Sequence, residues 1–263
     1  MKMELTIYQV DAFARAVFQG NPAAVCPLVE WLPDDILQAI ATENNLSETA
    51  YFVDRGDHFH LRWFTPAAEV RLCGHATLAS AHVLFAHLGF KQPEAVFQTL
   101  GGALRVRRDN GRYIMNFPAD QIQKVGPMPL INEALGLEPV EIVRGQDDYL
   151  ARLESADQLW NLKPDLRRII QLGNCRGLIV TAPGHDTDFA SRCFYPALSV
   201  DEDPVTGSAH TLLTPYWASL TGKREFEAVQ GGRRKGFLQC RLEGDRVHLS
   251  GQAQTYLEGK IFF

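Results

Sequence analysis

Two glycine-containing motifs hold the residues of this sequence that are best suited to chemistry. The first, Cys73-Gly74-His75, places a thiol and an imidazole beside a glycine, and a long apolar run follows it. The second, Gly207-Ser208, follows an acidic stretch and also precedes apolar residues. By residue type, the first motif is compatible with a metal site, a thiol nucleophile with its base, a ligand-binding helix start, or only a helix start.

Both glycines are predicted to begin a helix. A helix start leaves backbone N–H groups unpaired and carries a partial positive charge, and glycine lets a ligand approach the backbone closely. Gly74 and Gly207 are therefore candidate binding positions for a carboxylate or a phosphate. The alternative is that each glycine fits a turn and Ser208 caps its helix. Because helix residues two apart do not face each other, we expect no thiol–imidazole pair between Cys73 and His75.

Two carboxylates are candidates for acid/base chemistry. Asp203 precedes Pro204, which restricts the backbone before it, and a rigid carboxylate suits catalysis. The alternatives for Asp203 are a solvated loop charge or a partner of the helix dipole. Glu48 begins a predicted strand of otherwise apolar residues. Its own spacing indicates only an exposed glutamate, so the pattern alone does not decide its role.

The sequence carries no recognised metal or nucleotide motif. HExxH, Walker A and G-x-S-x-G patterns are all missing. The five cysteines are scattered and never form a C-x-x-C pair, which disfavours a disulfide framework and a zinc ribbon: they are Cys26, Cys73, Cys175, Cys193 and Cys240. We expect reduced thiols, and these patterns give no sign of a metal site.

Composition limits the class of partner. The chain has 263 residues, 46% of them hydrophobic, which is enough for a substantial core. Its formal net charge of −5 comes from interspersed acidic and basic residues, so no basic face is expected for nucleic acid or anionic membranes. No apolar stretch has the length of a membrane span or a signal peptide. These features predict a cytoplasmic protein that binds a small molecule.

The sequence also repeats itself. The segment Phe64–Val70 reappears as Phe194–Val200, and a helix-opening glycine follows each copy within a few residues. Further along, a glycine-rich lead-in, an alternating strand, a tight turn and a second strand occur in both halves. The offset stays at roughly 130 residues throughout, which favours internal duplication.

Two α+β halves follow from this repeat. Strand patterns dominate each half, and the two glycine-led helices are apolar on nearly every side, as expected for helices surrounded by protein. We therefore predict a curved mixed sheet around one central helix, twice. The predicted domains are residues 1–117 and 118–251, and residues 252–263 are candidates to return to the first domain.

Several short motifs together resemble a known family. In chain order they are Asp11-Ala-Phe, Gly20-Asn-Pro-Ala-Ala-Val25, Ser47-Glu-Thr-Ala50, Phe64-Thr-Pro, Cys73-Gly-His-Ala-Thr77 and Asp203-Pro-Val-Thr-Gly-Ser-Ala209. The set looks like the phenazine-biosynthesis PhzF-like isomerases and runs essentially from end to end. The resemblance implies the diaminopimelate-epimerase fold, with two pseudo-symmetric halves, and it is compatible with a homodimer.

The resemblance also implies roles for individual residues. It matches Glu48 to the family's acid/base glutamate, and His75, Asp203 and Ser208 to other polar active-site positions. Substrate binding is then expected at Asn21, Gly74, Gly207 and Cys73. The characterised member of the family isomerises a dihydro-hydroxyanthranilate without a metal or an organic cofactor. Diaminopimelate epimerase uses one cysteine from each half, whereas this chain offers Cys73 and no second cysteine beside Ser208.

The resulting hypothesis is a cofactor-independent isomerase. It would move a proton between carbons of a small carboxylate in a cleft between the halves, with Glu48 as the acid/base group and helix-start N–H groups as carboxylate donors. This works best if burial raises the pKa of Glu48 toward neutrality. The alternatives are an amino-acid racemase or epimerase that uses Cys73, and a non-catalytic protein that binds a metabolite or a partner.

Overall fold

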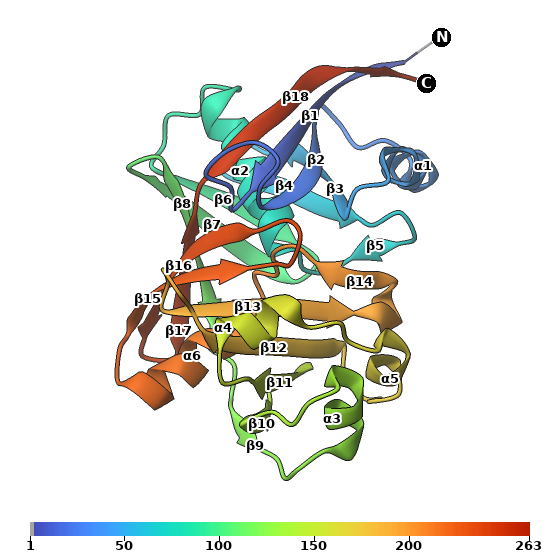
Figure 1. Cartoon of the computed structure of the whole chain (residues 1–263). Coiled ribbons are helices and arrows are strands. Elements are labelled where there is room, and N and C mark those ends of the chain that lie inside the picture. Colours follow the sequence, from blue (N-terminus) through green and yellow to red (C-terminus); the bar gives the residue numbers. More distant parts are fainter. Residues whose placement is uncertain (1–2) are drawn as a thin grey trace. The chain divides into compact units, whose positions relative to one another are not determined.

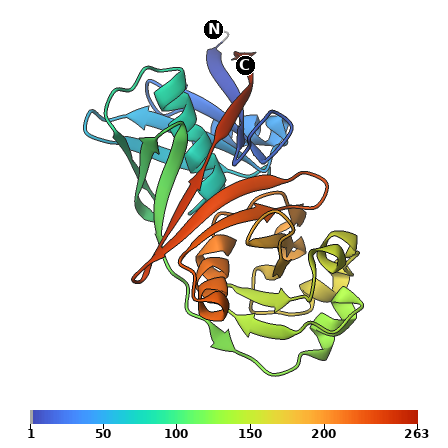
Figure 2. The same ribbon diagram turned by 60° about the vertical axis from the view of Figure 1, so that its left-hand side comes forward.

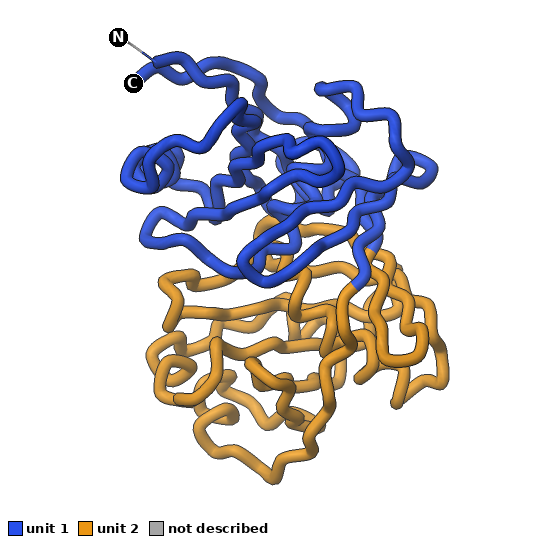
Figure 3. Tube along the Cα trace, turned by 180° about the vertical axis from the view of Figure 1, so that it is seen from behind, with its two compact units in different colours: residues 1–116, 250–263 blue, residues 117–249 orange. Residues whose placement is uncertain are grey.

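The computed structural model describes residues 3–263 and divides them into two compact units (Figure 3). Unit 1 comprises residues 1–116 and 250–263, and unit 2 comprises residues 117–249. The final segment of the chain therefore belongs with the N-terminal residues. These borders lie one and two residues from the predicted ones. Among the helices of residues 3–263, none has both the length and the apolarity needed to cross a lipid bilayer.

Unit 1 contains nine strands and two helices among its described residues. The strands are β1 (Glu4–Ala12), β2 (Asn21–Leu28), β3 (Glu48–Asp54), β4 (Phe59–Phe64), β5 (Glu69–Val70), β6 (Glu94–Thr99), β7 (Gly102–Asp109), β8 (Arg112–Pro118) and β18 (Ala253–Phe262). The helices are α1 (Asp34–Asn44) and α2 (Gly74–Ala86). The strand predicted to begin at Glu48 and the helix predicted to begin at Gly74 are β3 and α2.

The sheet of unit 1 is mixed. β1 pairs antiparallel with β18 and with β2, whereas β2 pairs parallel with β3. β3 continues antiparallel to β4, and β4 then pairs parallel with β6. In the β2–β3 ladder Ala23 lies opposite Glu48, so the first residues of these parallel strands lie at the same end of the sheet.

Helix α2 lies among these strands (Figure 2). It contacts β1, β2, β3, β7 and β18, and ten of its thirteen residues are buried. Its alanines let strands approach closely, while Leu78, Val83 and Phe85 fill the space between them. The buried hydroxyls of Thr77 and Ser80 bond to helix carbonyls at Cys73 and Ala76, so no hydroxyl of this pair is left unsatisfied.

Unit 2 repeats this plan (Figure 1). Its strands are β9 (Gln123–Lys124), β10 (Glu141–Arg144), β11 (Asp148–Arg152), β12 (Gly177–Pro183), β13 (Phe189–Tyr195), β14 (Val200–Asp203), β15 (Glu225–Gln230), β16 (Gly236–Glu243) and β17 (Arg246–Gly251). Its helices are α3 (Pro129–Leu135), α4 (Ala156–Asn161), α5 (Leu166–Ile170) and α6 (Ala209–Thr221), with a 3-10 turn, η1 (Pro196–Leu198).

The pairing order of unit 2 matches that of unit 1. β11 and β12 are parallel, β12 and β13 antiparallel, and β13 and β15 parallel, as are β2 with β3, β3 with β4, and β4 with β6. Helix α6 is the counterpart of α2 and buries most of its residues, with Pro215 inside it. The predicted α+β fold of two similar halves, each a mixed sheet with a central helix, is confirmed.

Candidate functional site

Local backbone geometry brings the candidate residues of unit 1 together at the N-terminal ends of two neighbouring strands, β2 and β3. Asn21 is the first residue of β2, and Glu48 is the first residue of β3. Gly20, just before Asn21, has a φ of +67°, and a Cβ there would overlap the carbonyl oxygen of Ala12. Glycine is therefore required at this turn. Cys73 and His75 come from the start of α2.

His75 is the centre of this group. Its Nε2 atom lies 3.0 Å from Oε2 of Glu48, and these side chains are only 6% and 17% exposed. The two atoms face each other without the alignment of a hydrogen bond, and neither has another hydrogen-bond partner within residues 3–263. On the other side of the ring, Nδ1 lies 3.3 Å from the amide nitrogen of Asn21. Ser47 orients that amide by donating to its oxygen at 3.3 Å.

These contacts fix the proton on the ring. In the neutral imidazole, Nδ1 accepts from the Asn21 amide and the proton lies on Nε2, toward Glu48, as assigned from these partners, whereas the protonated ring carries a proton on both nitrogens. Burial lowers the pKa of His75, but the neighbouring Cys73 and Glu48 outweigh burial and hold the pKa well above its usual range. The pair therefore tends to share a proton between imidazole and carboxylate.

The predicted pKa direction of Glu48 is wrong. Burial does raise the pKa of this carboxyl, but the charge of His75 and the polar contacts with His75 and Cys73 outweigh burial and leave the pKa below its usual value. Glu48 is thus a carboxylate at neutral pH, ready to accept a proton. It is also more buried than its own sequence spacing indicated.

The predicted absence of a contact between Cys73 and His75 is also wrong. Cys73 precedes the helix in an extended conformation, with φ −147° and ψ 107°, so helical spacing does not govern its direction. Its Sγ lies 3.5 Å from Nδ1 of His75. Burial and the charge of Glu48 raise the pKa of this thiol to about 11, so it is neutral at pH 7.

One group of side chains has the composition of a metal site. Ligand atoms of Glu48, Cys73 and His75 all lie within 4.8 Å of one another. Carboxylate, thiolate and imidazole are ligands that Zn²⁺ accepts, but the thiol must first lose its proton. His75 also turns a different ring nitrogen toward the thiol than toward the carboxylate. This arrangement is better suited to proton transfer than to holding one ion, and the expectation of no metal stays a prediction.

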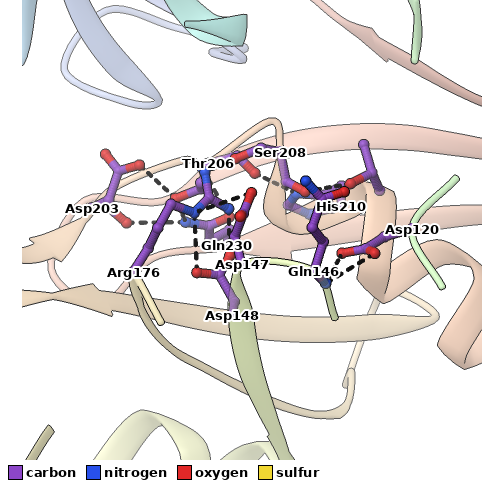
Figure 4. A network of polar contacts seen from close by, with 11 residues as sticks. Asp120, Gln146, Asp147, Asp148, Arg176, Asp203, Thr206, Ser208, His210 and Gln230 are labelled. Carbon is purple, nitrogen blue, oxygen red and sulfur yellow. Dashed lines mark hydrogen bonds and ion pairs between the residues drawn. The ribbon is translucent and has the colours of Figure 1, made fainter. Parts of the chain in front are cut away.

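A second polar group lies in unit 2 around the start of α6 (Figure 4). The hydroxyl of Thr206 donates to Oδ2 of Asp203 at 2.5 Å. Gln230 ties the same loop together: its Oε1 accepts from the backbone N–H of Thr206, and its Nε2 donates to the backbone oxygen of Asp203. Asp203 is therefore held at the end of β14. Ser208 precedes α6 but makes no side-chain capping bond.

Sequence reasoning missed Arg176 and Asp148 in this group. Nη1 of Arg176 donates to the hydroxyl of Ser208 at 3.2 Å, and its Nε and Nη2 donate to the two carboxylate oxygens of Asp148. Arg176 directly precedes the buried strand β12 and Asp148 begins β11. The signal in the sequence was a charged residue at the start of each strand. The internal repeat makes β12 and β11 the counterparts of β3 and β2.

The predicted site residues therefore form two groups, one in each unit. Unit 1 brings together Asn21, Glu48, Cys73, Gly74 and His75, and unit 2 brings together Asp203, Gly207 and Ser208. In each group, the first backbone N–H groups of a buried helix have no partner inside that helix.

Comparisons with known proteins agree with these features. A family model described as phenazine biosynthesis-like protein, PhzC-PhzF, matches residues 10–259. A Pseudomonas aeruginosa protein named uncharacterized isomerase is 51% identical, covering 98% of this chain and 99% of its own. The human phenazine biosynthesis-like domain-containing protein is 41% identical with the same coverage.

Solved structures show the same relationship. A PhzF family protein from Enterococcus faecalis aligns with a TM-score of 0.97 and 41% identity, over 99% of this chain and all of that one. A hydroxyproline epimerase from Agrobacterium vitis, at 12% identity and a TM-score of 0.60, shares the fold alone. The predicted family and epimerase-like fold are confirmed: the chain belongs to the phenazine biosynthesis-like (PhzC-PhzF) family.

Proposed function

We propose that the protein is a cofactor-independent isomerase that moves a proton between two carbons of a small carboxylate. The observation that carries this proposal is the buried Glu48–His75 pair, with 3.0 Å between carboxylate and imidazole. A carboxylate that is ionised at neutral pH and shielded from water is equipped to accept a proton from carbon. Its partner stabilises the ionised form before the reaction starts.

The proton balance of the reaction is simple. Glu48 accepts the proton of an activated C–H bond, and the bonding electrons delocalise into the substrate as an enolate or dienolate. Helix-start N–H groups at Gly74 and His75 donate hydrogen bonds to the negative charge that develops on oxygen. The protonated Glu48 then returns its proton to a different carbon. The net change is an isomerisation, and the carboxylate is regenerated.

We propose that Asp203 and Ser208 of unit 2 act on the same substrate. Asp203 is held by Thr206 and by Gln230, so its carboxylate is fixed before any ligand binds. Gly207 and Ser208 precede the first turn of α6, where backbone N–H groups suit an anionic oxygen. Unit 2 thus contributes binding and orientation, whereas Glu48 supplies the acid/base group.

Deuterium incorporation tests the proposal. The full chain is incubated in deuterium oxide with a dihydro-hydroxyanthranilate and with an extract of small metabolites, and mass spectrometry follows carbon-bound deuterium. We expect enzyme-dependent incorporation into a carboxylate, reduced by roughly 10²- to 10⁴-fold in Glu48→Gln. Glu94→Gln is the matched control, since Glu94 also begins a strand but forms a surface pair with Arg105. Full incorporation by Glu48→Gln, or none by the unaltered protein, would overturn the proposal.

A further inference from the structure

Arg176 of unit 2 is held in place by a buried carboxylate. Its Nε and Nη2 donate to Asp148 at 3.2 and 2.5 Å, and Asp148 is buried, with only 4% of its side chain exposed. Arg176 itself is 35% exposed and lies over the ring of Tyr195. A bidentate pair with a buried carboxylate holds the guanidinium plane in one orientation. The remaining edge, Nη1, points to Ser208 (Figure 4).

The internal repeat places this group next to the positions equivalent to the acid/base group of unit 1. Asp148 begins β11 as Asn21 begins β2, and both strands pair parallel with the next one. Arg176 directly precedes β12, whereas Glu48 begins β3. Ser208 and His75 stand at the starts of α6 and α2. By strand register Arg176 and Asp148 correspond to Ser47 and Ala23, so the equivalent strand ends hold titratable groups in unit 1 and a fixed cation in unit 2.

The fixed cation determines how the Ser208 hydroxyl is used. Arginine carries only donors and stays protonated in proteins, so Nη1 always donates to Ser208. A serine hydroxyl that accepts this bond keeps its own proton for another acceptor. Within residues 3–263 the hydroxyl has Arg176 as its hydrogen-bond partner, so its proton is available to a ligand. Ser208 is therefore set as a donor, and donation to it from a charged group makes it a stronger one.

We propose that Arg176, oriented by Asp148, is a positioning residue that makes Ser208 a dedicated hydrogen-bond donor to a carboxylate or enolate oxygen of the substrate. This inference rests on the proposed function for the identity of the substrate oxygen. It specifies the substrate class further, because an acceptor oxygen of the substrate uses the free hydroxyl proton, whereas a donor group would have to share an oxygen that already accepts from Arg176. Arg176 acts through Ser208 and needs no contact with the reacting atoms.

Thiol titration tests the placement without any substrate. In Ser208→Cys, the rate of alkylation by iodoacetamide at position 208 is followed against pH by peptide mass spectrometry, which separates it from the native cysteines. We expect the thiol pKa to lie below the usual value of about 8.5, because the guanidinium favours the thiolate. Adding the uncharged pair Arg176→Gln/Asp148→Asn should raise that pKa by about one unit.

The uncharged pair avoids a folding artefact. Arg176→Gln alone would leave the buried carboxylate of Asp148 without its partner, which would destabilise the fold. Arg144→Gln is the matched control, because Arg144 donates to the backbone oxygen of Asn174 and to the hydroxyl of Tyr149, next to these residues, but makes no bond to Ser208. It should leave the thiol pKa unchanged. An equal thiol pKa with and without the uncharged pair would overturn the proposal.

An exchange experiment separates this inference from the proposed function. In the deuterium assay, Ser208→Ala and the uncharged pair should each raise KM or lower kcat by about 10-fold, and together they should cost no more than Ser208→Ala alone. Arg176→Lys, which keeps a cation beside Asp148, should lose less activity than the uncharged pair. Additive losses would contradict action through Ser208. Retained activity in Glu48→Gln would instead refute the proposed function, while the thiol shift would still establish the placement of Arg176.

Discussion

A carboxylate buried beside an imidazole has two opposing influences on its proton. Removal from water favours the neutral acid, whereas the nearby positive charge favours the carboxylate. For Glu48 the second influence is larger, because His75 is 3.0 Å away and the Asn21 amide holds the ring in place. The free protein therefore begins with a base at Glu48. The conjugate acid of Glu48 forms only when the carboxylate accepts a proton from the substrate.

Removal of His75 should reverse the pKa shift of Glu48. In His75→Gln, burial remains but the charge is lost, so the pKa of Glu48 should rise above its usual value of 4.5. The base form would then disappear at higher pH than in the unaltered protein. The acid limb of kcat/KM for deuterium incorporation should move toward neutral pH. An acid limb that stays in place would show that His75 does not set this pKa.

Cys73 should be dispensable for proton transfer. Its thiol pKa of about 11 leaves almost no thiolate at pH 7, and the thiolate is the reactive form. Cys73→Ser should keep deuterium incorporation within about 10-fold of the unaltered protein, a loss smaller than general acid/base groups typically give. A loss as large as that of Glu48→Gln, with deuterium at a stereocentre, would instead favour the alternative of a racemase or epimerase that uses Cys73.

At the scale of elements, α2 is held in unit 1 by polar contacts as well as by packing. His82, near the middle of the helix, contacts the hydroxyl of Tyr113 through Nδ1 at 3.0 Å and that of Thr255 through Nε2 at 2.8 Å. His87, just past the helix, contacts the same Thr255 hydroxyl at 2.7 Å. Thr255 lies on β18, so these contacts attach the C-terminal strand to the helix that carries His75.

His82 should make unit 1 sensitive to acid. Burial lowers its pKa from 6.5 to about 4, so the unfolded chain binds this proton more readily than the folded chain. Stability should therefore fall as pH drops from about 6.5 to about 4, by up to ~1.4 kcal/mol per pH unit. His82→Gln should reduce this loss, as measured by denaturant unfolding at pH 7 and pH 5. The surface variant His185→Gln serves as the control, and equal pH dependence in both variants would contradict the prediction.

At the scale of the whole molecule, the repeat made the fold readable from sequence. Gly74 and Gly207 mark equivalent helix starts, and apolar residues on nearly every side of both helices predicted their burial. The candidate residues were accessible only through motifs. The pairing of Glu48 with His75, and of Arg176 with Asp148, depends on strand register and cannot be read from local spacing. The prediction of a raised pKa for Glu48 was wrong for the same reason, because its charged partner His75 lies 3.0 Å away in space but on another element.

The return of the chain to unit 1 leads to a test of its domain organisation. β18 pairs with β1 along its full length, and Thr255 binds both His82 and His87. A chain that ends at Gln252 should therefore lose amide-exchange protection in β1 and α2, because both lose partners, while β11 to β13 keep theirs. A chain that ends at Ile261 is the control, since it loses only the pairing of Phe262 and Phe263 with Glu4 and Met3 and keeps the rest of β18, so protection should fall at most at the first residues of β1. Unchanged protection of β1 in the shorter chain would show that residues 3–116 form unit 1 without the C-terminal strand.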